Sequence, residues 1–422
     1  MNMHSAPKLT PAEASLVDAF AARVSSLPGS PDVLARRDAA IEQVKAGLPT
    51  RRVESWHYTD LRRLLTAAPA FEAKTDATAI DPLIAGSLVL LVANGRTAPV
   101  NGALDGLTVR AVADKLSDGS ISQALALQGR DDAVGAINGA FLTDGWFLDV
   151  AGGAELARPV EIQNLHGAGQ SHVRTAVRVG DGAKLMLVER QTGDGAALVS
   201  SVSHLTVGDG ADVTWLIVQE QPADATHLGQ FNATLGKDAK LTLFFMNAGG
   251  KLVRQEVRVG QGGEGSEFRL RGINLLTDDT HCDVTMVLDH TAPHTTSTEV
   301  IRNVATGRAR GVFQGQIRVD REAQKTDAKM ACNTLLLSDE AEFSAKPELE
   351  IFADDVACGH GATVTEIDRD HLFYLMARGV EERLARGLLV KAFVAEIVEE
   401  LEDEALVEVL EGKLDAWFAA HA

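Results

Sequence analysis

A five-residue turn recurs at a constant interval in the middle of the chain, and it constrains the fold more than any other feature. Residues 179–183 and 207–211 both read Val-Gly-Asp-Gly-Ala, and residues 235–239 read Leu-Gly-Lys-Asp-Ala, a spacing of 28 residues each time. Each turn leads into alternating apolar and polar residues, as expected of a short β-strand. A repeat of this length predicts a solenoid, whose units bury their apolar faces only by stacking.

Stacked strand units of this kind form a β-helix. A β-sandwich of glycine-turned hairpins would also show short alternating strands, but it does not require one turn sequence at a constant interval. We therefore predict a mainly β fold with a β-helix core. Later copies of the turn, at 259–260, 305–307 and 337–341, are less regular, so the number of coils is not predicted.

Both ends of the chain are predicted to be helical. From residue 10 to residue 65 the apolar residues recur at helical spacing, and after Asp368 this spacing returns in three successive segments. Between them, residues 88–93 resemble a strand, whereas 109–116 and 131–141 resemble helices. The sequence predicts three domains: a mainly helical N-terminal domain over 1–145, the β-helix core over 146–365 and a helical C-terminal domain over 366–422.

Composition excludes several classes of partner. The chain has 422 residues with 59 acidic and 40 basic side chains, so its formal net charge is −19. This charge repels phosphate backbones and anionic lipids, and we expect neither nucleic acid nor a membrane as a partner. Residues 1–8 do not resemble a signal peptide, and no apolar run is long enough to span a bilayer. We expect a cytoplasmic protein.

Familiar catalytic motifs are absent from the sequence. It contains no GxxxxGK[ST] phosphate loop, no HExxH, no GxSxG and no GxGxxG in a βαβ setting. We therefore do not expect the chain to hydrolyse ATP itself.

One concentrated group of reactive residues lies at 354–361, Asp-Asp-Val-Ala-Cys-Gly-His-Gly. In an extended strand, residues two apart share a face, so Cys358 and His360 would point the same way. A thiolate and an imidazole could form half of a site for iron, and the glycines would let another backbone approach. Two ligands do not complete a coordination sphere, so another chain would supply the rest. An isolated Cys-x-His pair is more often packed than metal-bound, and the residues alone leave both interpretations open.

The other cysteines and histidines give a weaker signal. Cys282 and Cys332 have no ligand-type residues at metal spacing except His281, and we interpret both as buried thiols. His281, His290 and His294 lie in a polar, threonine-rich stretch and are expected to be solvated.

Several short motifs of the C-terminal third resemble the SufB/SufD family of iron–sulfur cluster assembly proteins. They are Ala323-Gln324-Lys325-Thr326-Asp327, Leu335-Leu336-Leu337-Ser338-Asp339, Lys346-Pro347-Glu348-Leu349-Glu350-Ile351, Cys358-Gly359-His360-Gly361-Ala362-Thr363 and Leu372-Phe373-Tyr374-Leu375. The segments 56–61, Trp-His-Tyr-Thr-Asp-Leu, and 141–145, Phe-Leu-Thr-Asp-Gly, are similar to N-terminal motifs of that family. The low cysteine count favours a SufD-type over a SufB-type chain.

The resemblance implies a right-handed parallel β-helix between helical ends that acts as a non-catalytic scaffold of a SufBCD complex. Its partners would be a SufB-like scaffold and a SufC-like ATPase, with a cysteine desulfurase as the upstream source of sulfur. A nascent, transient iron–sulfur cluster would form at the interface with the SufB-like chain, with His360 as a ligand and Cys358 as a second candidate. A flavin is possible at the level of the complex, and the isolated chain could form a homodimer.

The C-terminal helices would bind the ATPase. The apolar stripe proposed for this contact is Leu384, Leu388, Leu389, Phe393 and Ile397. The same stripe could instead cap the open end of the solenoid.

Two other functions compete with this interpretation. The first is a β-helix carbohydrate-active enzyme, a lyase or hydrolase, which would need acidic and basic residues aligned on successive coils and would normally be secreted. The second is a purely structural or binding solenoid in which His360 is only packed.

Overall fold

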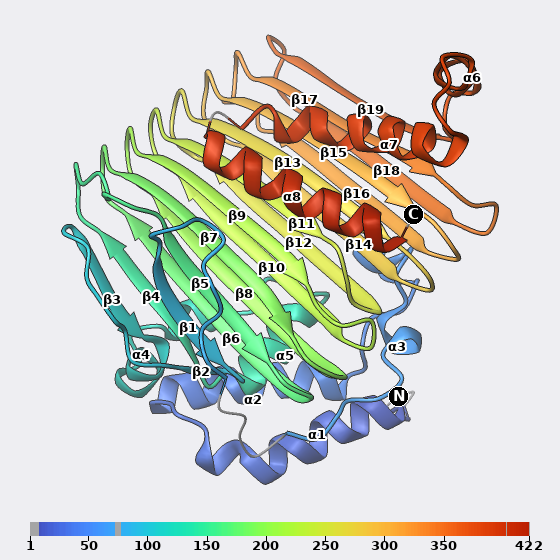
Figure 1. Ribbon diagram of the computed structural model, residues 1–422. Helices are drawn as coiled ribbons and strands as arrows, with labels where there is room; N and C mark the ends of the chain where they lie inside the picture. The colour runs from blue at the N-terminus through green and yellow to red at the C-terminus, as the bar shows by residue number, and fades with distance from the viewer. Residues whose placement is uncertain (1–7, 72–76, 402, 422) are drawn as a thin grey trace.

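The computed structural model describes residues 8–71, 77–401 and 403–421. Two long β-sheets lie face to face, and from residue 144 onward consecutive strands of the chain alternate between them (Figure 1). Helices cover the outer face of each sheet. The structure confirms the predicted mainly β fold with a parallel β-helix core and helical ends.

The strands of each sheet stack in chain order. Within the described residues, the ten-stranded sheet runs in the order β2 (Arg96–Thr97), β1 (Leu88–Ala93), β5 (Val160–His166), β7 (Lys184–Gly193), β9 (Asp212–Glu220), β11 (Lys240–Asn247), β13 (Glu267–Leu276), β15 (Thr296–Ala305), β17 (Asp327–Leu336) and β19 (Ala357–Thr365). The nine-stranded sheet runs in the order β3 (Leu107–Ala111), β4 (Asp144–Val150), β6 (Gly169–Val179), β8 (Ala197–Val207), β10 (Thr226–Leu235), β12 (Leu252–Gln261), β14 (His281–His290), β16 (Arg310–Val319) and β18 (Glu342–Ile351). Pairing is parallel except for β1 with β2 and β3 with β4.

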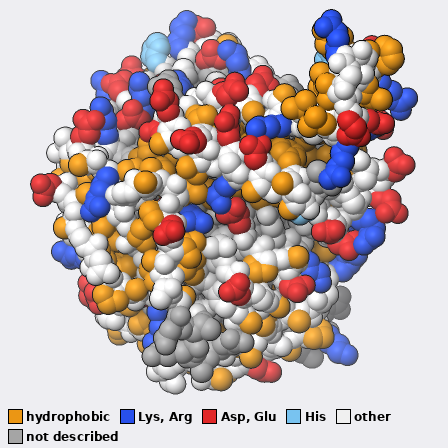
Figure 2. Space-filling model, viewed as in Figure 1, with side chains coloured by type: hydrophobic (Ala, Val, Ile, Leu, Met, Phe, Trp, Pro, Cys, Tyr) orange, Lys and Arg blue, Asp and Glu red, His pale blue; other side chains and the backbone are white. Residues whose placement is uncertain are grey.

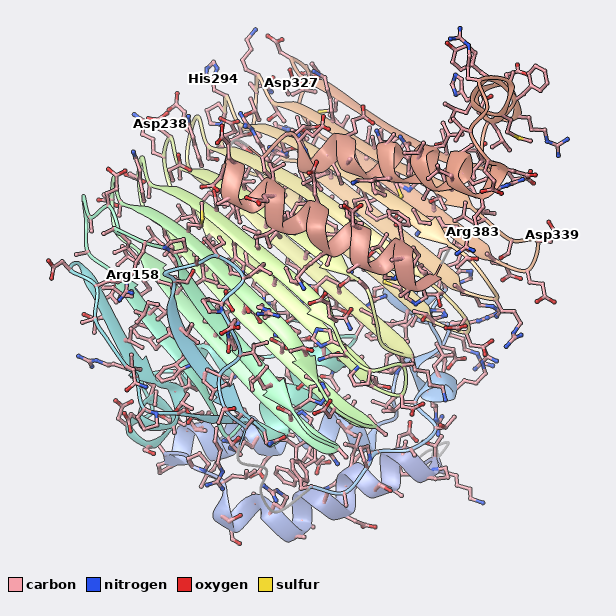
Figure 3. The ribbon with its side chains drawn as sticks, in the orientation of Figure 1. Arg158, Asp238, His294, Asp327, Asp339 and Arg383 are labelled. Carbon is pink, nitrogen blue, oxygen red and sulfur yellow. The ribbon has the colours of Figure 1, made fainter. Side chains whose placement is uncertain are left out.

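The recurring turn stacks one coil on the next. The backbone N–H of Asp209 donates to the carboxylate of Asp181 over 3.0 Å, and the N–H of Lys237 donates to Asp209 over 2.7 Å. A Cβ atom at Gly208 would lie 2.5 Å from the Asp181 carboxylate, so only glycine allows this approach. Asp238, His294 and Asp327 lie along this row of turns, and Asp339 lies at the opposite row (Figure 3). The repeat therefore reflects contacts between neighbouring coils.

Alternate residues of both sheets fill the space between them. Leu241 and Leu243 from β11 meet Val257 and Val259 from β12 in one continuous hydrophobic core. A row of buried amides runs through the same interior: Asn247 donates to Asn274 over 2.8 Å, and Asn274 donates to Asn303 over 2.7 Å. These bonds satisfy most of the polar groups in the row, which would otherwise be costly to bury, although Oδ1 of Asn247 has no hydrogen-bond partner among the described residues.

The N-terminal helices pack on the nine-stranded sheet. The helical elements of this region are α1 (Pro11–Arg23), η1 (Val24–Ser26), α2 (Pro31–Lys45), η2 (Glu54–Trp56), α3 (Leu61–Leu64), α4 (Val112–Asp118), η3 (Ser122–Leu125) and α5 (Ala133–Phe141). Thr10 and Glu13 form a capping box that starts α1. Leu16 and Phe141 share a core with Leu198 and Leu228 of the sheet.

The local predictions in this region were mostly correct. The strand at 88–93 is confirmed, and the helix predicted at 131–141 corresponds to α5. The helix predicted at 109–116 was partly wrong, because residues 107–111 form β3 and the helix begins only at Val112. Antiparallel pairing with β4 keeps this short segment extended.

The C-terminal helices are α6 (Arg369–Ala377), α7 (Glu382–Val398) and α8 (Glu404–His421), as the helical spacing predicted. Both α7 and α8 lie across the outer face of the ten-stranded sheet, whereas α6 projects away from the body of the protein (Figure 1). Val394 and Leu410 pack against Phe244 and Ile273 of the sheet. Among the described residues, no helix is long and apolar enough to cross a membrane.

Candidate functional site

The last coil of the solenoid has two exposed strand edges. In the described chain, β18 and β19 are the final strands of their sheets and pair with another strand on one side only. Apolar side chains are exposed beside these edges: Ile351 is 40% exposed, Phe352 57% and Val364 45%. Unpaired edges with apolar side chains favour pairing with another chain.

Cys358 and His360 both lie on β19. The parallel register pairs Cys358 with Ala328 and His360 with Met330, and both of these β17 residues are buried in the solenoid interior. The two side chains therefore continue interior rows of the β-helix and share one face, as the sequence predicted. Cys358 is half-buried against the core, whereas His360 is exposed.

The thiol of Cys358 is held in its protonated form. Burial raises its pKa, and the negative charges of Asp327 and Glu299 act in the same direction. A hydrogen bond involving the Ala328 backbone opposes this shift. Cys358 would therefore need a metal ion or another cation nearby before it ionised readily.

The other face of β19 is open. No heavy atom lies within 4 Å of a Cβ atom built at Gly359 or at Gly361. Another backbone could therefore approach this strand closely, as the sequence suggested.

The described residues do not form a complete metal site. They contain no cluster of three or more His, Cys, Asp or Glu side chains placed to hold a metal ion. Cys358 and His360 can therefore supply at most part of a coordination sphere.

The remaining cysteines are inaccessible, as predicted. Cys282 is 1% exposed and Cys332 is 0% exposed, and each thiol lies beside an amide of the interior row. Burial raises the pKa of Cys332 to about 12. Their positions explain why neither contributes to the exposed edge.

The expectation that the three nearby histidines are solvated was wrong in part. His290 is fully buried and its Nδ1 atom lies 2.8 Å from the hydroxyl of Thr295. His281 is half-buried, and only His294 is exposed. The polar sequence around His290 concealed its inward orientation, because alternate residues of β14 face the core.

The residues of the proposed ATPase-binding stripe differ in how far they are exposed in the structure. Leu384 and Leu388 are 58% and 46% exposed, whereas Ile397 is fully buried against the sheet. Leu389 is half-buried, and so is Phe393, whose ring lies 5.0 Å from the Arg302 guanidinium.

The ATPase-binding stripe proposed from the sequence did not include the exposed apolar residues of α6. These are Phe373, Tyr374 and Met376. They lie on α6, which contacts α7, the helix that carries Leu384 and Leu388, and hydrophobic side chains gather on this projecting part of the molecule (Figure 2). The sequence signal that could have identified them as a binding surface was their clustering in a short helix after the last strand.

A parallel β-helix that ends in open strand edges beside a thiol–imidazole pair offers a surface at which another chain could pair. The family model "SUF system FeS cluster assembly, SufBD core domain" matches residues 162–393. This match covers more than half of the chain, and the chain therefore belongs to the SufBD family of iron–sulfur cluster assembly proteins.

Individual relatives agree with this assignment. The chain is 29% identical to the iron-sulfur cluster assembly protein SufD of Escherichia coli strain K12, over 86% of this chain and 88% of the relative. It is 33% identical to an iron-sulfur cluster assembly SufBD family protein of Synechocystis, over 47% of this chain and 44% of the relative. It is also 29% identical to the chloroplastic protein ABCI7 of Arabidopsis thaliana, over 65% of this chain and 62% of the relative.

Proposed function

We propose that this protein is a non-catalytic scaffold subunit of a SufBCD-type complex and that it contributes His360 to a nascent iron–sulfur cluster. The observation that carries the proposal is the position of His360, exposed on an unpaired edge strand beside Cys358. Family membership supports a role in cluster assembly over the carbohydrate-enzyme alternative.

A SufB-like chain would occupy the open end of the solenoid. The edges of β18 and β19 offer backbone hydrogen bonds, and the exposed apolar residues beside them would be buried by the partner. The glycines of β19 would allow the partner's backbone to come close to His360. The same edge would support a homodimer when the chain is isolated.

A SufC-like ATPase would bind the apolar surface on α6 and the start of α7. We define this docking surface as Phe373, Tyr374, Met376, Leu384 and Leu388. These side chains are exposed and would be buried by a partner, and α6 projects from the body of the protein (Figure 1). Leu389 and Phe393 would border this surface, while Ile397 would hold α7 on the solenoid.

The cluster is the cargo of this site and not a resident cofactor. Neutral imidazole binds iron and dissociates more easily than thiolate, which suits a site that must release its product. Cys358 would be an auxiliary ligand, because its raised pKa opposes ionisation in the absence of metal. Sulfur would come from a cysteine desulfurase, and any flavin would belong to the whole complex.

The test is an anaerobic purification of the tagged chain from its native cytosol. Subunit stoichiometry, iron and acid-labile sulfide are measured on the same sample. We expect a SufB-like chain and a SufC-like ATPase to copurify. Recovery of the chain alone or as a homodimer would contradict the scaffold role.

Substitution of His360 separates cluster formation from assembly. His360→Ala should leave the subunit composition unchanged and strongly reduce the iron and sulfide of the complex. Thr363→Ala, on the opposite face of the same strand, is the matched control and should retain both. Normal cluster content in His360→Ala would show that the histidine is only packed.

A further inference from the structure

A basic hollow lies between the N-terminal segment 51–64 and the solenoid, away from the edge that carries His360. Its volume is about 490 Å³, and it is bordered by the turns that lead into β14, β16 and β18. Figure 1 shows α3 beside this row of turns. We call this hollow the arginine groove, after Arg51, Arg63, Arg308 and Arg310, which line it.

The groove is lined by positively charged side chains, although the protein as a whole is strongly acidic. The four arginines face two lining carboxylates, those of Asp279 and Glu342, although the chain as a whole has a formal charge of −19. A concave surface lined by one sign of charge concentrates its electrostatic potential. The groove is therefore suited to an anion that the rest of the surface would repel.

Two of the arginines remain available to a ligand. Arg308 pairs with Asp279 through two contacts of 2.7 Å, and Arg310 lies 3.4 Å from Glu342. In the described part of the chain, no carboxylate lies within ion-pair distance of the Arg51 or Arg63 guanidinium. Both residues line the hollow from the N-terminal side.

The pKa of His281 reflects the positive charges around the groove. Burial lowers the pKa of His281, the carboxylate of Asp283 opposes this, and the guanidinium groups of Arg310, Arg254 and Arg63 lower it further. Charges from the N-terminal segment and from the solenoid therefore converge at one wall of the groove.

The walls of the groove are fixed by hydrogen bonds. The hydroxyl of Thr59 lies 2.9 Å from Nε2 of His281, and it also donates to Asp283. His281 and Arg310 are in register on β14 and β16. On the other side, Nδ1 of His57 lies 3.2 Å from the carbonyl oxygen of Arg51. The arginines are thus presented by two elements that are joined to one another.

The ligand chemistry follows from these groups. Guanidinium is a planar donor that binds phosphate with two parallel hydrogen bonds, and it stays charged at all physiological pH values. The volume lies in the range of small-molecule sites. We propose that the arginine groove binds a small molecule carrying at least two phosphate groups, with Arg51 and Arg63 as its principal ligands.

The proposal is tested with inorganic pyrophosphate as the probe. Calorimetric titration of the full chain at low ionic strength should show saturable binding that weakens as salt is added. The double variant Arg51→Gln/Arg63→Gln should weaken binding by about tenfold or more, equivalent to roughly 1.4 kcal/mol. Arg52→Gln is the matched control, because Arg52 is exposed in the same segment but does not line the groove.

Further probes distinguish phosphate recognition from general attraction of anions. Citrate and a short polyglutamate peptide should bind at least about tenfold more weakly than pyrophosphate, a difference of roughly 1.4 kcal/mol. Absence of pyrophosphate binding, or equal binding by the double variant, would overturn the proposal. Tighter binding of the peptide would also overturn it and would identify the groove as a docking surface for an acidic protein segment.

Discussion

The guanidinium of Arg254 lies over the indole ring of Trp56, with 4.1 Å between its Cζ atom and the ring centroid. Both side chains are fully buried, one on β12 and the other in the N-terminal segment. Arg254 also pairs with Glu256 over 3.2 Å and with Asp283, and it donates to the carbonyl oxygen of Ser55. The aromatic motif at 56–58 therefore attaches the N-terminal helices to the β-helix.

Removal of the indole should loosen this attachment. We expect Trp56→Ala to lower the free energy of unfolding by about 3–5 kcal/mol, because it leaves a cavity and removes the stacking partner of a buried arginine. Chemical denaturation monitored by circular dichroism measures the change. Phe373→Ala, an aromatic truncation at a residue that is 72% exposed, should have little effect. Similar losses in the two variants would contradict the attachment role.

The two halves of the α7 stripe should respond differently to substitution. Leu384→Glu/Leu388→Glu should abolish capture of the SufC-like ATPase and change the free energy of unfolding by no more than about 0.5 kcal/mol, because both residues are exposed. Ile397→Ala should destabilise the fold by about 2–5 kcal/mol, because its side chain is fully buried. Pull-down and denaturation are compared on the same proteins. ATPase capture by the double glutamate variant would exclude the proposed docking surface.

The three cysteines should differ in reactivity. In the folded chain, iodoacetamide should modify Cys358 alone, because Cys282 and Cys332 are buried in the solenoid interior. The reaction should be slow at neutral pH and accelerate as pH rises, because the pKa of Cys358 is raised by burial. Mass spectrometry with and without denaturant locates the modified residues. Equal labelling of Cys332 in the folded chain would contradict the buried position of that thiol.

Glu299 should make stability fall as pH rises. This side chain is fully buried, and burial raises its pKa to about 8, against the weaker opposing effects of Ser297 and Arg271. The folded-state pKa of Glu299 exceeds its unfolded value of about 4.5. The contribution of Glu299 to the free energy of unfolding is therefore complete below pH 4.5 and is lost as pH rises through about 8. Between these two pH values, the contribution of Glu299 to the free energy of unfolding changes by up to about 1.4 kcal/mol per pH unit.

Comparison with Glu299→Gln isolates this effect. The free energy of unfolding of both proteins is measured by urea denaturation at several pH values from 5 to 8. Glu299→Gln should become more stable relative to the parent as the pH rises. Glu350→Gln, at an exposed position, controls for the loss of one negative charge. Parallel pH profiles of the parent and Glu299→Gln would show that Glu299 does not hold its proton in the folded state.

Much of the candidate site could be predicted from short-range sequence patterns. Residues two apart in a strand share a face, so the common orientation of Cys358 and His360 followed from their spacing. Their position on an unpaired edge did not follow, because an edge is defined by the absence of a neighbouring strand in space. The inward orientation of His290 was also hidden, since burial in β14 depends on register and not on local composition.

The solenoid could be predicted from the sequence because the first stacked turns repeat a glycine and an aspartate that contact each other between coils, as Asp181, Gly208 and Asp209 show. Tertiary packing determines which part of α7 is buried, because an apolar helical stripe has the same spacing whether it packs on its own sheet or on another protein. It also brought Arg63 to Arg310, since the groove exists only after the N-terminal segment has docked on the solenoid. Local hydrogen bonding repeats along the chain and is therefore readable from sequence, whereas contacts between distant segments depend on how those segments pack.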